Sequence, residues 1–116
     1  MTEYIPNMPI YIQIMDMIKL KVLSGEWKEG DRVPSVRDLS VEFLVNPNTM
    51  QRALGELERI GLLYSERTAG RFITSDKNKI NEIRKEKAEQ STKGFLEQMR
   101  KIGFSNAEII KMIEGD

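Results

Sequence analysis

Polar side chains that can recognise a nucleic-acid base gather near the start of one segment, residues 46–57. Asn48, Thr49, Gln51 and Arg52 bring two amides, a hydroxyl and a guanidinium close together in the sequence. Arginine can bond guanine O6 and N7, and asparagine or glutamine can bond adenine N6 and N7. These residue types fit the edge of a DNA major groove. An ordinary amphipathic surface helix with a polar outer face would look the same, so the segment alone leaves both interpretations open.

The same segment carries the signals of a helix that would hold these side chains. Asn46 is a good N-cap because its side-chain oxygen can accept a hydrogen bond from a free backbone N–H of the first turn. Pro47 fits the first helical position, where its missing N–H costs nothing. Apolar residues then follow at helical spacing and predict one buried stripe, formed by Met50, Ala53, Leu54, Leu57 and Ile60. The polar side chains point away from that stripe, near the start of the helix.

A second short helix is predicted just before this one, beginning at Ser35. Ser35 as N-cap and Asp38 three residues later resemble a capping box, with Asp in the usual place of Glu. Arg37 lies in the first turn, where a cation is unfavourable beside the positive end of the helix dipole. A phosphate or base partner would explain it, as would a surface ion pair with Asp38 or Glu42. Two short helices joined by a tight turn predict a helix-turn-helix in which the second helix is the reader.

A β-hairpin is predicted after the reader helix, because two short apolar-rich runs flank the turn Thr68-Ala69-Gly70. Arg67 and Arg71 stand on either side of this turn, and Gly70 supplies a backbone angle that the hairpin needs. Such a cationic hairpin is the wing of a winged helix, and its tip can enter the minor groove or lie along phosphates. Alternatively, Arg71 pairs with Glu66 across the hairpin.

The rest of the chain predicts three more helices and one short strand. A first helix runs from Pro9 to about Leu23, after an irregular arm, and the pair Arg32-Val33 is a candidate strand. After residue 76, a charged segment leads into an apolar seam formed by Ala88, Thr92, Phe95, Met99 and Ile102. Ser105 with Glu108 predicts a capping box for a last helix. The fold class is mainly α with a small β-hairpin: a winged helix-turn-helix domain at 1–75 and a helical dimerisation tail at 76–116.

Composition excludes several classes of function. Lys plus Arg and Asp plus Glu both number 18, so the formal net charge is zero and a nucleic-acid surface must be a local basic patch. Cys and His are both absent, which removes the commonest metal ligand and the commonest general base. We therefore expect no enzyme activity, no catalytic residues, no metal site and no cofactor. No signal peptide or membrane-spanning run is apparent, so a cytoplasmic protein without a membrane partner is expected.

At this point the residues resemble the gluconate-repressor-like (GntR) family of bacterial transcription regulators, over about residues 9–74. The resemblance rests on Pro34-Ser35-Val36-Arg37, Asn46-Pro47-Asn48-Thr49, Arg52-Ala53-Leu54 and Gly61-Leu62-Leu63, with the wing Gly70-Arg71-Phe72-Ile73. The short tail and the Asn-Pro-Asn-Thr turn look like the YtrA subfamily. The resemblance implies a homodimeric winged-helix repressor that binds an inverted-repeat operator in double-stranded DNA. It implies, more weakly, control of genes for ABC-type transporters.

The resemblance also implies which residues contact DNA. The predicted DNA-binding residues are Ser35, Arg37, Asn46, Pro47, Asn48, Thr49, Gln51, Arg52, Arg67, Thr68, Gly70 and Arg71. This chain departs from the family pattern at several of them. Many relatives carry Arg or Lys where Pro47 and Gln51 stand, and their wing commonly reads Gly-Lys-Gly-Thr where this chain has Thr68-Ala69-Gly70-Arg71. These departures affect the half-site sequence and leave the binding mode as expected.

Two other interpretations stay open at this stage. One is a protein-interaction winged helix that does not touch DNA, which the zero net charge and the surplus apolar surface of the first helix favour. The other adds an unidentified small-molecule effector to the DNA-binding dimer. The segment after the wing is too short for a closed ligand cavity of its own, so such a ligand would have to bind between subunits.

Overall fold

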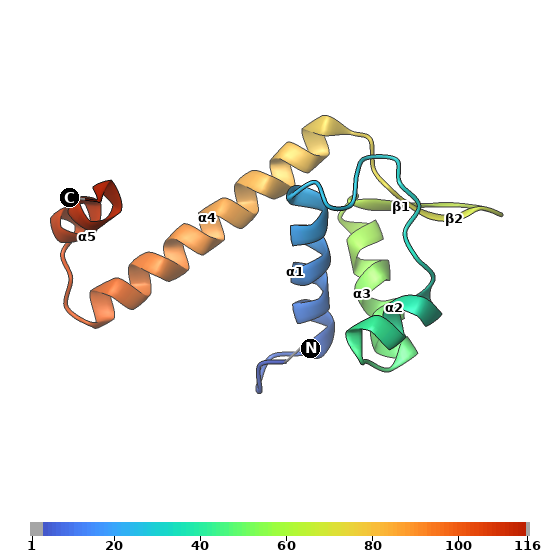
Figure 1. Cartoon of the computed structure of the whole chain (residues 1–116), viewed down its shortest axis with the longest axis horizontal. Coiled ribbons are helices and arrows are strands. Elements are labelled where there is room, and N and C mark those ends of the chain that lie inside the picture. Colours follow the sequence, from blue (N-terminus) through green and yellow to red (C-terminus); the bar gives the residue numbers. More distant parts are fainter. Residues whose placement is uncertain (1–3, 116) are drawn as a thin grey trace. The chain divides into compact units, whose positions relative to one another are not determined.

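The computed structural model describes residues 4–115 and is mainly α-helical with one β-hairpin (Figure 1). Its elements in chain order are α1 Ile10–Leu23, α2 Val36–Phe43, α3 Pro47–Arg59, β1 Leu63–Glu66, β2 Gly70–Ile73, α4 Lys77–Lys101 and α5 Asn106–Glu114. The predicted fold class is confirmed. The chain divides into two compact units, Met1–Ile80 and Asn81–Asp116, and the boundary between them lies within α4.

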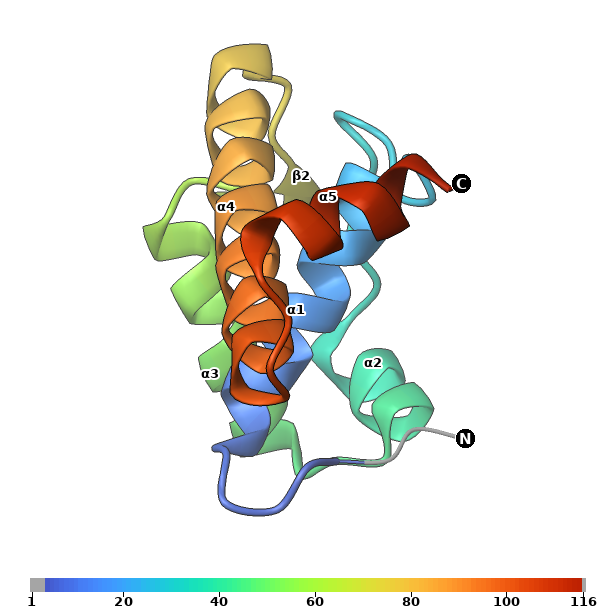
Figure 2. The same cartoon turned by 90° about the vertical axis from the view of Figure 1, so that its left-hand side faces the viewer.

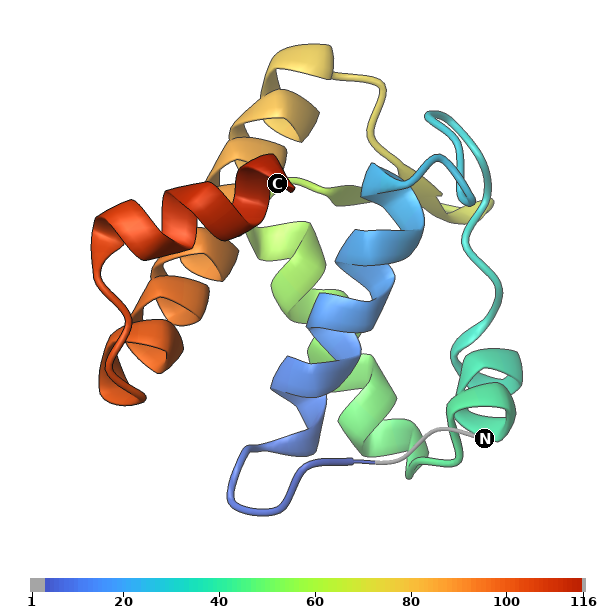
Figure 3. The same ribbon diagram turned by 60° about the vertical axis from the view of Figure 1, so that its left-hand side comes forward.

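The core of the first unit forms around α3, which packs against α1, α2 and β1 (Figure 3). The largest fully buried side chains of this core come from these elements, from β2 and from the segment before β1: Ile14, Ile18, Leu39, Met50, Leu54, Leu57, Leu62, Leu63 and Ile73. Fully burying one such side chain contributes about 1.5–3 kcal/mol. The stripe predicted on the reader helix is confirmed, since all its members are buried except Ile60, which is half-buried.

Side-chain caps fix where α2 and α3 begin. Ser35 Oγ accepts a hydrogen bond from the Asp38 backbone N–H at 3.0 Å, and Asn46 Oδ1 accepts from the Asn48 backbone N–H at 2.7 Å. Each cap stabilises its helix by about 1 kcal/mol. Between the two helices, Leu44 adopts a left-handed conformation with φ of 57° and ends α2. The caps and this turn together set the angle at which α3 leaves α2.

The hairpin pairs Leu63 with Ile73 at its base and Glu66 with Gly70 near its tip. Gly70 therefore begins β2, where the sequence predicted it in the turn, and its φ of +102° favours glycine. Arg32 pairs with Phe72 as an isolated bridge, which confirms the short strand predicted there.

Side-chain hydrogen bonds hold residues 4–8, the segment before α1, against the rest of the first unit. The buried amide of Gln13 accepts a hydrogen bond from the Ile5 backbone N–H and donates to the Ile5 and Met8 carbonyls. The Tyr4 hydroxyl donates to the Phe43 carbonyl at 2.6 Å. The predicted irregular arm is therefore tied to α1 and α2, although residues 1–3 lie outside the described part.

A loop connects α1 to the Arg32 bridge and carries Trp27. The Trp27 backbone N–H donates to the Lys21 carbonyl at 2.9 Å, and its ring lies 5.8 Å from the Lys21 ammonium. Trp27 is half-buried in the first unit.

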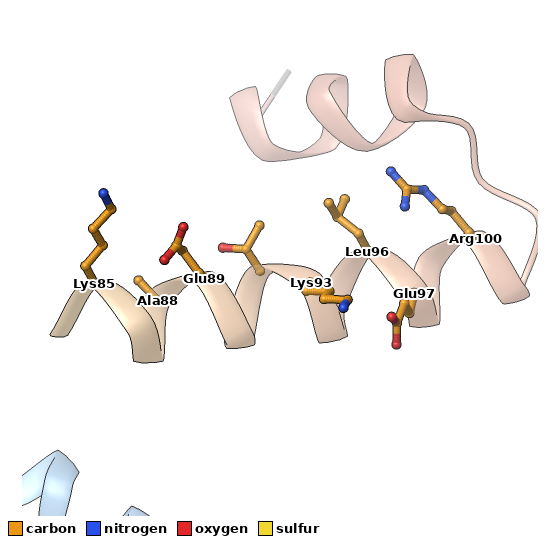
Figure 4. Close-up of a pocket in the computed structure, with 8 residues that line it drawn as sticks. Lys85, Ala88, Glu89, Lys93, Leu96, Glu97 and Arg100 are labelled. Atoms are coloured by element: carbon orange, nitrogen blue, oxygen red, sulfur yellow. The ribbon is translucent and has the colours of Figure 1, made fainter. Parts of the chain in front are cut away.

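The second unit contains the rest of α4 and α5. Ser105 and Glu108 exchange both bonds of the predicted capping box at the start of α5. Figures 2 and 4 show α5 folded back beside α4, and in Figure 4 the side chains of Leu96 and Arg100 point toward α5. An open, mostly apolar groove of about 430 Å³ runs along α4, and its lining residues are Lys85, Ala88, Glu89, Thr92, Lys93, Leu96, Glu97 and Arg100.

Much of the apolar surface of this second unit is exposed. Phe95 and Ile102 of the predicted seam are 42% and 69% exposed, and on α5 only Ile109 is buried among the described residues. Gly94 does not interrupt α4. None of the helices within residues 4–115 combines the length and apolar character that crossing a bilayer requires.

Candidate nucleic-acid interface

The exposed strip of α3 carries the amides that the sequence singled out. Asn48, Gln51 and Gly55 are all exposed and recur at helical spacing, opposite the buried stripe. Among residues 4–115, no heavy atom other than those of its chain neighbours and the adjoining helix backbone lies within 4 Å of where a Cβ of Gly55 would stand. In the free protein this strip is therefore open to solvent, and it presents donors and acceptors suited to base edges.

One side of the strip is bounded by α1. The Arg52 guanidinium lies over the Tyr11 ring, with its carbon 3.8 Å from the ring centroid. Thr49 and Glu56, three and four residues away along α3, are half-buried. Arg52 is exposed, as a residue of the outer face should be, but its charged end leans onto α1.

The other side of the strip is bounded by the hairpin. Glu58 of α3 accepts hydrogen bonds from Ser65 Oγ, at 2.8 Å, and from Arg71 Nε. Partial burial raises the pKa of Glu58, but the bonds from Arg71 and Ser65 and the Arg71 charge outweigh it, so the pKa lies below the ordinary value. The carboxylate partner of Arg71 is thus Glu58 and not Glu66, and the hairpin is tied to α3 through this ion pair.

The start of α2 faces the hairpin across a second groove. This groove, of about 470 Å³, is lined by Arg32, Val33, Pro34, Ser35, Val36, Asp38, Gly70 and Arg71. Arg37 is exposed, and no ion pair with Asp38 or Glu42 forms within residues 4–115. Glu42 instead lies 4.0 Å from Lys21. The surface-pair explanation of Arg37 therefore fails, and its guanidinium is available to an anion.

The tip of the hairpin is a small exposed turn. Arg67 and Thr68 are exposed there, and Arg67 has no carboxylate partner among the residues described. A Cβ added at Gly70 would come within 3.2 Å of Arg32 Nε, so the Arg32 side chain crosses the hairpin at this glycine.

Sequence reasoning missed two residues beside the predicted set, Arg32 and Tyr11. Arg32 was expected only as strand backbone, and its bridge to Phe72 is what places its side chain on the hairpin face. Tyr11 is spaced like the buried residues Ile14 and Ile18 of α1, and no sequence pattern pairs it with Arg52. Within residues 4–115, no group of three or more acidic, His or Cys side chains is arranged to hold a metal ion.

The family model for bacterial regulatory proteins of the gntR family matches residues 10–73, which include the helix-turn-helix and the hairpin. The chain belongs to the gntR family. Among its members, the uncharacterised HTH-type transcriptional regulator YhcF of Bacillus subtilis (strain 168) is 33% identical over 97% of this chain and 93% of its own length. The HTH-type transcriptional repressor YtrA of the same organism is 43% identical over 59% of this chain and 52% of its own length. The predicted family is confirmed, and the similarity to YtrA agrees with the predicted YtrA-like subfamily.

Solved structures of gntR-type proteins show the same fold. A GntR family transcriptional regulator from Listeria monocytogenes aligns with a TM-score of 0.87 and 34% identity, over 97% of this chain and 99% of that one. AraR(DBD) in complex with operator ORR3 aligns with a TM-score of 0.56 and 28% identity, over 64% of this chain and 87% of that one. The first unit is therefore a gntR winged helix-turn-helix.

Proposed function

We propose that this protein is a sequence-specific transcriptional repressor that binds double-stranded DNA as a homodimer, on an inverted-repeat operator. The observation that carries the proposal is the exposed strip of α3, where Asn48 and Gln51 stand between arginine side chains on both flanks. The YtrA repressor and the operator complex of AraR(DBD) support it, since both share this fold or sequence. A transcriptional repressor and an operator complex both agree with transcription regulation by DNA binding.

Each predicted residue has a role in this proposal. Asn48 and Gln51 contact base edges in the major groove, because their amides stand on the exposed face of α3, opposite the buried stripe. The cations contact backbone phosphates around it: Arg37 at the start of α2, Arg52 beside α1, and Arg67 and Arg71 on the hairpin. The remaining predicted residues shape these contacts through caps, turns and small polar groups: Ser35, Asn46, Pro47, Thr49, Thr68 and Gly70.

Arg71 keeps a place in this set despite its ion pair. Only its Nε donates to Glu58, so the outer nitrogens of the guanidinium are not engaged by any hydrogen bond in the described residues. Glu58 therefore fixes the direction of the Arg71 side chain along the groove that Arg32 and Ser35 also line. A phosphate contact there carries affinity without sequence information.

The homodimer is supported by the second unit. The second unit, described as far as residue 115, leaves Phe95, Ile102 and Ile113 exposed, which is more apolar surface than a small helix pair usually shows to water. A second copy of the same helices would cover it, and a two-fold dimer would present two α3 helices to two half-sites. ABC-type transporter genes are the proposed target class, on the resemblance to YtrA. An unidentified small-molecule effector would bind at the same subunit interface.

A winged helix that binds only protein is the second candidate, because Val41 on α2 and Leu44 just after it are 71% and 63% exposed. Salt dependence separates the two candidates. Duplex DNA is first selected from a random library, and its affinity is then measured over a range of salt concentrations. We expect the logarithm of the association constant to fall linearly with the logarithm of salt concentration, by about 0.9 for each phosphate neutralised.

Variants test the assignment of roles in the same assay. Asn48→Ala and Gln51→Ala should reduce discrimination between the selected and the random duplex by about 1–3 kcal/mol, whereas Lys111→Ala on α5 should change neither affinity nor slope. A wild-type protein that selects no sequence and binds duplex DNA without salt dependence would rule out the proposed function.

A further inference from the structure

The contact between Arg52 and Tyr11 joins two elements that the DNA-binding proposal treats separately. The guanidinium carbon lies 3.8 Å from the ring centroid, well inside the range of about 6 Å at which a cation and an aromatic face attract. Arg52 has no carboxylate partner among residues 4–115, so the ring is the contact that the structure gives its charged end. Glu56, one turn later, is engaged by Arg59 at 3.2 Å.

We propose that Tyr11 is a positioning residue that holds the Arg52 guanidinium ready for a backbone phosphate. This inference rests on the proposed DNA-binding function and adds a member to its site. A ring can cover only one face of the planar guanidinium, so the N–H groups around its edge stay free to donate to phosphate oxygens.

Geometry favours a phosphate over a base as the partner of Arg52. Asn48, Gln51, Arg52 and Gly55 are all exposed on α3, but the Arg52 guanidinium is turned toward α1 by its contact with Tyr11. Phosphates line the edges of the DNA major groove, and the base edges lie at its bottom. A side chain that leans away from the reader helix toward α1 therefore lies closer to a phosphate than to a base.

Positioning lowers the cost of forming this contact. An arginine that is free in the unbound protein loses rotamer freedom when it binds, whereas one that already rests on a ring loses less. The Tyr11 ring is itself half-buried on α1, and α1 packs against α3, so its position is set by the core. Removing the ring should thus weaken DNA binding through Arg52 and leave the fold in place.

The experiment is a double-substitution cycle on the full chain with the selected duplex and a random duplex. Tyr11→Leu removes the ring and keeps an apolar side chain, and Tyr11→Phe keeps the ring as the matched control. We expect Tyr11→Leu to weaken binding of both duplexes about two- to fivefold, the size of an exposed cation–π contact, and Tyr11→Phe to stay within about twofold of wild type. In an Arg52→Ala background, Tyr11→Leu should have no further effect. Thermal unfolding of each variant is measured beside binding.

Several results would overturn the inference. Equal losses for Tyr11→Phe and Tyr11→Leu would assign the effect to the hydroxyl, and an undiminished loss in the Arg52→Ala background would show that Tyr11 acts without Arg52. A loss on the selected duplex alone would make Arg52 a base contact. If wild type itself shows no salt-dependent DNA binding, the proposed function fails first, which keeps that failure distinct from a failure of the positioning role.

Discussion

At the scale of single residues, the arginines of the first unit differ in what already engages them. Arg37 and Arg67 are exposed without carboxylate partners in the described part of the chain, Arg52 rests on an aromatic ring, and Arg71 is paired with Glu58. An unpaired exposed cation gives its full charge to a phosphate, whereas a paired one must share it. Because the net charge of the chain is zero, DNA binding needs a local basic patch, and the arginines without carboxylate partners in residues 4–115 provide it.

Arg67→Ala and Arg71→Ala should accordingly behave differently. Arg67→Ala should weaken selected and random duplexes by similar factors and lower the salt slope by roughly one unit, because a lone phosphate contact is lost. Arg71→Ala should do the same and also lower the stability of the protein, because Glu58 loses the partner that ties the hairpin to α3. Salt titrations and chemical denaturation of both variants check this. A change in the preferred base for either variant would place sequence recognition on the hairpin instead.

Glu58 also predicts how stability depends on pH. Its pKa is lowered in the folded protein, so its contribution to stability is fully present above its ordinary value of 4.5 and is lost as pH falls through the lowered pKa. Glu58→Gln removes this contribution. The difference in unfolding free energy between wild type and Glu58→Gln should therefore be constant near neutral pH and shrink as acid is added. Urea denaturation between neutral pH and about pH 3 measures it. A difference that grows in acid would have the wrong sign.

At the scale of elements, α3 has an inner face that packs in the core and an outer face that is exposed. Its inner residues are fully buried, and its two edges are held by Tyr11 and by the Ser65 and Arg71 side chains. The outer strip contains a glycine in mid-helix that nothing nearby requires. Glycine is less favourable than alanine inside a helix by about 1 kcal/mol.

Two alanine substitutions test this view of α3 against each other. Gly55→Ala should raise the unfolding free energy by about 0.5–1 kcal/mol, because the methyl group meets no atom within 4 Å. Gly61→Ala, just after the helix, should lower it by about 1 kcal/mol or more, since its φ of +87° strains any L side chain and its Cβ would stand 3.2 Å from the Lys79 side chain. Chemical denaturation compares the two. Destabilisation by Gly55→Ala would mean that α3 is not regular there.

Helices and strands could be predicted from the sequence where local residue types determine them. Contacts between different elements could not. Asn46, Ser35 and Ser105 cap their helices as their residue types indicate, and the apolar stripe of α3 is buried as its spacing indicates. The partner of Arg71 was missed because Glu66 stands across the predicted hairpin turn from it, whereas the turn between α3 and β1 brings Glu58 close instead.

The candidate site shows the same division. The exposed residues of α3 could be predicted from the sequence because they alternate with the buried stripe at the helical period. The roles of Tyr11 and Arg32 could not be predicted in this way. Each takes part in a contact between two different elements, and the spacing of residues along one element does not reveal such a contact.

At the scale of the whole molecule, the exposed apolar seam that runs along α4 to Ile102, just after it, predicts how the protein associates. Phe95→Glu and Ile102→Glu should convert the proposed dimer to a monomer, since a charge buried at an apolar interface without a partner is costly. Val41→Glu on α2, where the side chain is 71% exposed, is the control and should leave the dimer intact. Sedimentation of the full chain at micromolar concentration distinguishes these states. Dimers that persist in both seam variants would assign association to another surface.

Trp27 gives the protein an internal optical reporter. It is the one tryptophan of the sequence and lies in the first unit, whereas the second unit, residues 81–116, contains no tryptophan and is largely helical. Intrinsic fluorescence therefore follows the melting of the winged helix, while far-ultraviolet circular dichroism follows both units. Coincident curves from the two signals would show one cooperative transition, and displaced curves would resolve the tail as a separately melting part. No added dye or label is needed to see whether the protein unfolds in one step or two.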